Sequence, residues 1–231
     1  MKNSRLLRSI SCLFIILMCF FNVVYAESPG DVNAAAESGL SHMLASIPKG
    51  YELKYGFANR EEFGTTTIGV PYQMQTIHPE VMKGNAAITD DMITSVEEWR
   101  FPVICDGRVR ALLTVAKVEG RWQAVDIGAA TLASEIDTLE KSLSLAKLNI
   151  NRIILRLYQI RSDFIVIADS SGKVTTGSFY PLNSEQKGYR GSQNEILKSS
   201  SSTFQDLLPG LRDRYRNEYH PENNTIYEGR K

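Results

Sequence analysis

Two short turns in the middle of the chain constrain the fold more than any other feature. Asp106-Gly107 and Glu119-Gly120 are dipeptides of the kind that close a β-hairpin, and aspartate and glycine both tolerate a positive φ. The segments beside them are rich in β-branched and aromatic side chains: 98–105, 108–118 and 121–127. This spacing predicts three consecutive antiparallel strands, a meander in which Pro102 marks an edge or a bulge.

Helical and strand patterns flank that meander on both sides. Apolar residues at helical spacing predict helices over 31–47, with Asp31 as the N-cap, and over 129–147. Alternating or wholly apolar runs predict further strands: 51–55, 72–77, 152–158, 163–168 and 173–179. We therefore expect an α+β fold. Its single antiparallel sheet, a meander plus a hairpin, has about five to seven strands, with helices packed on one face.

Residues 1–26 have the pattern of a secretory signal peptide. Basic residues precede an apolar run over 10–24, and Ala26 ends the segment with the small side chain that signal peptidase accepts. The run is shorter than the roughly 20 residues of a membrane anchor, and Cys19 lies inside it rather than at a lipoprotein position. We expect cleavage after Ala26 and a secreted or periplasmic protein with no membrane span after cleavage.

The remainder of the chain divides by composition into two parts. Residues 27–182 contain the elements predicted above and form the expected α+β domain. Residues 183–231 are a polar C-terminal segment that we expect to be partly helical or disordered. A helix around Phe204 is predicted there, and Pro209-Gly210 would interrupt it.

The charge and cysteine content exclude several classes of function. The chain has 26 basic and 26 acidic residues, so nothing suggests a nucleic-acid partner, for which a basic surface is expected. Cys105 is the only cysteine after residue 26, which excludes an intramolecular disulfide in the mature protein. The three histidines are far apart and no metal-ligand spacing occurs, so neither a metal nor a cofactor is expected.

Two catalytic arrangements remain as alternatives. Cys105 and His78 form the one thiol–imidazole pair that resembles a nucleophilic dyad, although an acidic residue, Asp106, directly follows the thiol in sequence. A hydrolase with dispersed acidic residues is the second arrangement. No serine-hydrolase elbow, phosphate-binding glycine loop or dinucleotide fingerprint is present, so catalysis is the less favoured interpretation.

A binding surface on the meander is the favoured interpretation. Tryptophan and arginine are the residue types that anchor interfaces, and the predicted strands bring several of them together. These candidate ligand- or partner-binding residues are Trp99, Arg100, Arg108, Arg110, Arg121 and Trp122. We expect either a protein or a small molecule as the partner.

Three segments of the chain resemble a pattern found in uncharacterised secreted bacterial proteins: IGVPY at 68–72, WRFPV at 99–103 and GRWQAVDIG at 120–128. The resemblance implies a bacterial envelope or extracellular protein and names no activity. The resulting hypothesis is a non-catalytic binding or interaction module of the bacterial cell envelope. A secreted peptidase inhibitor or regulator is the alternative that uses the same sheet.

Overall fold

The computed structural model describes residues 29–84, 87–145, 150–168, 172–182 and 203–219. The chain divides into two compact units, 1–31 and 32–231, and the fold below is that of the second. The expected signal peptide and its cleavage site after Ala26 lie outside the described residues, as does most of the polar segment 183–231. No helix among the described residues is long and apolar enough to cross a membrane.

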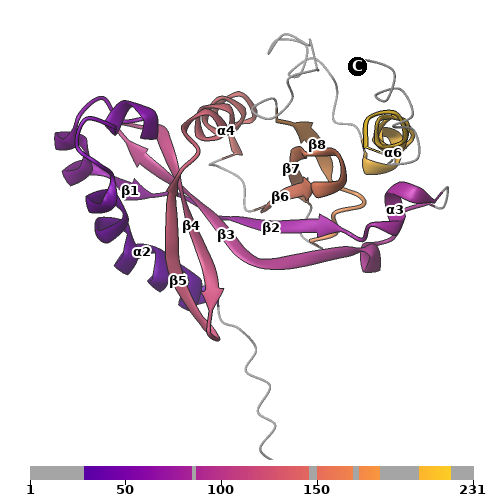
Figure 1. Cartoon of the computed structure of the whole chain (residues 1–231), viewed down its shortest axis with the longest axis horizontal. Coiled ribbons are helices and arrows are strands. Elements are labelled where there is room, and N and C mark those ends of the chain that lie inside the picture. The colour runs from indigo at the N-terminus through magenta and orange to yellow at the C-terminus, as the bar shows by residue number, and fades with distance from the viewer. Residues whose placement is uncertain (1–28, 85–86, 146–149, 169–171, 183–202, 220–231) are drawn as a thin grey trace, which may run out of the picture. The chain divides into compact units, whose positions relative to one another are not determined.

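One sheet of eight strands organises the described residues (Figure 1). Its order is β5-β4-β3-β2-β6-β7-β8, and the short β1 pairs with β3. The strands are β1 Thr67–Ile68, β2 Tyr72–Ile77, β3 Ile93–Cys105, β4 Arg108–Val118, β5 Arg121–Gly128, β6 Asn151–Leu157, β7 Ser162–Ala168 and β8 Ser178–Pro181. The expected α+β class is confirmed, and the sheet is mostly antiparallel.

The sheet is larger than predicted and is not wholly antiparallel. β2 pairs in parallel with β6, with Gln73 opposite Ile153 and Met74 opposite Ile154. The whole meander and two α-helices separate these two strands in sequence. Turn residues report only on strands that follow one another directly, whereas a parallel pair needs a long crossover that leaves no local signal. The prediction of a purely antiparallel sheet of five to seven strands was therefore wrong.

The meander formed by β3, β4 and β5 confirms the turn-based prediction. Asp106 and Gly107 have φ values of 50° and 68°, and Glu119 and Gly120 have values of 50° and 77°. Both residues of each turn thus have the positive φ of a type I′ hairpin. β3 begins at Ile93, earlier than predicted.

Pro102 lies inside β3, where this strand changes partners. β2 pairs with β3 up to Arg100, and β1 takes over at Val103. The Pro102 carbonyl accepts a hydrogen bond from the Gly69 N–H at 2.7 Å. A shift in register against β4 follows between Val103 and Ile104. Proline lacks an N–H and cannot donate a hydrogen bond to a neighbouring strand. A strand therefore tolerates it where the strand changes partners beside a bulge, as β3 does here.

Helices cover both faces of the sheet, so the expectation of helices on one face was wrong. Helix α4 (Ala130–Leu143) packs on the face that carries Met74 and Ile154. Helices α2 (Pro29–Ser46) and α6 (Phe204–Arg214) pack on the opposite face, over different strands. The reason is visible in β6 and β7, whose residues are buried almost without alternation. A strand that is apolar on both sides needs a layer of structure on each.

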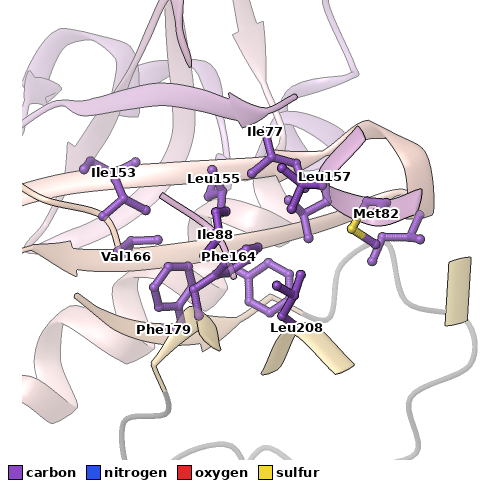
Figure 2. Close-up of a cluster of buried hydrophobic side chains, with 14 of the residues drawn as sticks. Ile77, Met82, Ile88, Ile153, Leu155, Leu157, Phe164, Val166, Phe179 and Leu208 are labelled. Carbon is purple, nitrogen blue, oxygen red and sulfur yellow. The ribbon is translucent and has the colours of Figure 1, made fainter. Parts of the chain in front are cut away.

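The core on the α6 side joins segments between Ile77 and Leu208 that are far apart in the sequence (Figure 2). Phe164 and Phe179 make an edge contact with ring centroids 6.3 Å apart, and Phe204 of α6 lies 5.1 Å from Phe179. Leu208 is fully buried on the same cluster. The described part of the C-terminal segment therefore packs on the core of the domain.

Several local predictions need correction. Residues 51–55 form a 3-10 helix (η1, Glu52–Tyr55) rather than a strand, because Gly56 closes the turn with a φ of 90°. Asp31 lies within the first turn of α2 rather than at its N-cap. Helix α6 continues through Pro209, because a capping box starts it and buried side chains on both sides of the proline hold it on the core.

Candidate functional site

A pocket of about 410 Å³ opens between the start of β4 and helix α4. We name it the β4–α4 pocket. β4 contributes residues 108–110, which directly follow the Asp106-Gly107 turn. Gly56, at the end of η1, completes the wall, and α4 contributes Ala130, Ser134, Asp137 and Lys141.

The helical repeat explains why α4 presents polar groups to this pocket. Residues 130, 134, 137 and 141 recur at intervals of three and four, so they form one stripe along the helix. A different side of the helix buries Ala133, Ile136 and Leu139 against the sheet. Burial of the apolar face therefore positions the polar stripe beside β4.

Asp137 connects the two walls of the pocket. Its Oδ1 accepts a hydrogen bond from the Val109 N–H at 3.2 Å, and its Oδ2 lies 2.6 Å from Lys141 Nζ. The first contact fixes α4 against the start of β4. The second holds the Lys141 ammonium at the pocket, where more than half of its side chain is exposed.

The two arginines of β4 are held differently. Arg110 forms an ion pair of 2.7 Å with Glu62, whose second carboxylate oxygen accepts the Ala58 N–H at 2.7 Å. Arg110 Nε is buried and has no hydrogen-bond partner among the described residues. The Arg108 side chain is exposed and makes no hydrogen bond or ion pair within the described part of the chain. Arg108 therefore offers its whole guanidinium, whereas the Arg110 guanidinium is engaged with Glu62 and its Nε is buried.

The β4–α4 pocket carries an excess of positive charge. Arg108, Arg110 and Lys141 provide three cations against two carboxylates, that of Asp137, which pairs with Lys141, and that of Glu62, which pairs with Arg110. Ala130 is the first residue of α4, whose first turn contains no acidic residue. The N-terminal end of a helix carries a partial positive charge, which adds to that of the side chains. The arrangement suits an anionic group.

The structure separates the six predicted binding residues into distinct groups. Arg108 and Arg110 line the pocket at the start of β4. Arg121 and Trp122 pair with Val118 and Lys117 at the other end of β4, about 33 Å away at the usual rise of a strand. One groove cannot contain all six residues.

The remaining predicted residues serve the sheet. Arg100 forms an ion pair of 2.7 Å with Glu98 and donates a hydrogen bond to the Thr114 hydroxyl. Trp99 and Trp122 are partly buried and pack against the core under α2. Lys117 Nζ lies 5.8 Å from the centroid of the Trp122 ring. These contacts stabilise the meander and leave neither indole as an exposed anchor.

The geometry excludes the Cys105–His78 dyad. His78 directly follows β2, whose last residue Ile77 pairs with Ile93 at the start of β3. Cys105 is the last of the 13 residues of β3, about 40 Å further along the strand. The thiol is buried, with Thr65 Oγ1 at 3.4 Å. The alternative of a Cys105–His78 dyad is therefore excluded.

Glu62, Cys105 and Asp106 bring three potential metal-ligand atoms within 4.8 Å of one another. Both carboxylate oxygens of Glu62 are already occupied, one by Arg110 and the other by the Ala58 N–H. These contacts account for the Glu62 carboxylate without a metal ion. We therefore assign Glu62 the structural role of orienting Arg110.

A second polar cluster is buried where the parallel strands meet. The Tyr72 hydroxyl donates a hydrogen bond to Glu140 Oε1 at 2.7 Å, and Arg152 Nε lies 3.2 Å from the same oxygen. Arg152 also donates to the Leu145 carbonyl at 2.8 Å. Burial, reinforced by the Glu140 carboxylate, raises the pKa of Tyr72 far above its usual value. Because its members bond to one another and to the backbone, this cluster fastens α4 to β2 and β6.

Sequence reasoning missed Ser134, Asp137 and Lys141. The helix was predicted from its apolar spacing alone, and its polar side was left without a role. The signal that points to these residues is their common stripe on the helix. Its position beside β4 depends on tertiary packing.

Comparisons with known proteins add no assignment: no protein-family model matches the chain, and neither the curated proteins nor the solved structures contain a significant match.

Proposed function

We propose that this protein is an exported, non-catalytic binding protein of the bacterial cell envelope and that the β4–α4 pocket binds a small anionic molecule. One observation carries the proposal. Two arginines that stand out in the sequence, Arg108 and Arg110, meet Lys141 in a single pocket. The export part of the proposal is supported by the pattern of residues 1–26.

The dimensions and lining of the pocket favour a small molecule. Its volume of about 410 Å³ lies within the range of roughly 300–1,000 Å³ that ligand pockets usually have. The groups it offers are the exposed Arg108 guanidinium, the Arg110 guanidinium beyond its ion pair with Glu62, and the exposed Lys141 ammonium. All of these are donors with positive charge, so an anion is the complementary ligand.

A protein partner on the meander has less support. Protein interfaces are usually anchored by buried aromatic side chains of one partner that fill a pocket of the other. Here both tryptophans already pack within the molecule, against the α2 side of the sheet. This argues for the pocket rather than for the sheet face as the binding site.

Titration calorimetry of the purified protein, expressed from its full-length sequence, tests the proposal. We expect inorganic phosphate or malate to bind with a stoichiometry of one, and Arg108→Gln to weaken that binding at least tenfold. Arg121→Gln removes another exposed arginine, which lies at the far end of β4, and leaves the affinity unchanged. Mass spectrometry of the purified protein tests the expected cleavage after Ala26. Absence of binding by every anion, or an equal loss in both variants, contradicts the proposed site.

A further inference from the structure

We infer that the ligand of the β4–α4 pocket is a phosphate monoester of a small polyhydroxyl compound, an inference that rests on the proposed function. It joins two observations. First, the cations come from two elements, β4 and α4, on either side of the pocket. Second, the pocket is larger than a phosphate group alone requires.

The arrangement of charge favours a dianion with several oxygens. Arg108 and Arg110 approach from β4, whereas Lys141 approaches from α4. A phosphate monoester carries a charge of about −1.5 to −2 near neutral pH and presents three acceptor oxygens. A carboxylate has two oxygens in one plane, which a single guanidinium already satisfies. The tetrahedral phosphoryl group is thus better matched to donors from two directions.

The volume and the remaining lining indicate what the phosphate is attached to. A water molecule takes up about 30 Å³ of liquid, so a phosphate group with its few heavy atoms leaves much of the 410 Å³ unfilled. The groups beyond the cations are the Ser134 hydroxyl and the Asp137 carboxylate, whose oxygens retain lone pairs beyond those used by Val109 and Lys141. Hydroxyl groups on the carrier would pair with both. An apolar carrier would find little complementary surface.

Calorimetry with defined probes tests the inference. We expect glucose 6-phosphate to bind at least tenfold more tightly than inorganic phosphate or malate, and glucose alone not to bind. Lys141→Gln lowers the affinity for glucose 6-phosphate at least tenfold, and Arg121→Gln is the matched control. Ser134→Ala lowers the affinity for glucose 6-phosphate about threefold and leaves the affinity for inorganic phosphate unchanged, because the Ser134 hydroxyl pairs with the sugar rather than with the phosphate.

The contrary results are distinguishable. Equal affinity for malate, or for inorganic phosphate, overturns the inferred ligand class and leaves the anion pocket in place. Vesicles of phosphatidylcholine with phosphatidic acid carry the same phosphate monoester on a membrane. Binding to these vesicles in preference to glucose 6-phosphate overturns the soluble carrier. If none of the anionic probes binds, the proposed function itself fails.

Discussion

The two halves of the sheet are assembled in different ways, and they differ in burial: β5 is mostly exposed or half-buried, whereas β6 and β7 are buried almost throughout. The meander half consists of β3, β4 and β5, which follow one another in the chain through two-residue turns. The junction half consists of β2, β6, β7 and β8, and its central contact is the parallel pair of β2 with β6. In the first half neighbours in space are neighbours in sequence. In the second half, β2 and its partner β6 are separated in sequence by the meander and α4.

This difference shows which interactions determine the strand pairing in each half. Positive-φ residues set the register of the meander locally. The junction half depends on long-range contacts: the core cluster under α6 and the buried cluster of Tyr72, Glu140 and Arg152. Strand β2 of the junction half connects it to the meander half, since it pairs with β3 on one side and β6 on the other. We therefore expect the halves to unfold together.

Deleting one large core side chain in each half tests that coupling and has the largest expected effect. Phe101 and Phe204 are both fully buried, one under α2 and one in α6. Their replacement by alanine should lower the free energy of unfolding by about 3–5 kcal/mol each. Both tryptophans lie in the meander half. Their fluorescence therefore reports on that half, while far-ultraviolet circular dichroism reports on the whole chain.

We expect the two signals to give one coincident denaturation curve in both variants. A circular-dichroism transition that precedes the fluorescence transition in Phe204→Ala would show that the junction half unfolds independently. The coupling through β2 would then be disproved.

Breaking the buried cluster at the junction has the next largest effect. Glu140→Leu leaves the Arg152 guanidinium, whose side chain is 3% exposed, without its carboxylate. Removal of one partner of a buried ion pair costs about 3–5 kcal/mol, whereas an apolar replacement of both partners is often nearly neutral. We therefore expect Glu140→Leu/Arg152→Met to recover at least half of the loss in urea denaturation. A double variant that is as unstable as Glu140→Leu would indicate that packing, rather than charge, dominates here.

The smallest effect concerns a single turn of the meander. Gly107 has a φ of 68° with open space around it, so an added Cβ meets only the backbone penalty of the left-handed region. We expect Gly107→Ala to cost about 1–2 kcal/mol in urea denaturation. Gly64 also has open space but no positive φ, and Gly64→Ala should stay within about 0.5 kcal/mol. An equal loss of unfolding free energy in the two variants would show that the positive φ of Gly107 does not help to specify the meander.

The meander half and the junction half also differ in how much of their structure could be predicted from the sequence. The strand ends at the two turns of the meander were predicted correctly, because Asp106-Gly107 and Glu119-Gly120 act through their own backbone angles. The parallel pairing of Gln73 with Ile153, and the passage of α6 through Pro209, depend on contacts between distant segments. Nothing in the neighbourhood of these residues reports such contacts.

The candidate site divides in the same way. Arg108 and Arg110 could be selected from sequence because they lie close together on one predicted strand. Their companion Lys141 could not, since it belongs to a helix whose position depends on the burial of its opposite side. Trp122 was grouped with the arginines, although the length of β4 places it at the other end of the strand.

The sequence by itself determined the α+β class, the three-stranded meander and its turns, because hydrophobic period and positive φ act over a few residues. Only the tertiary structure decided that helices cover both faces, that β2 joins β6 in parallel and that a basic pocket forms between β4 and α4. These features arise when apolar faces from distant segments are buried against one another. Such burial depends on the whole chain and is not encoded in any one segment of it.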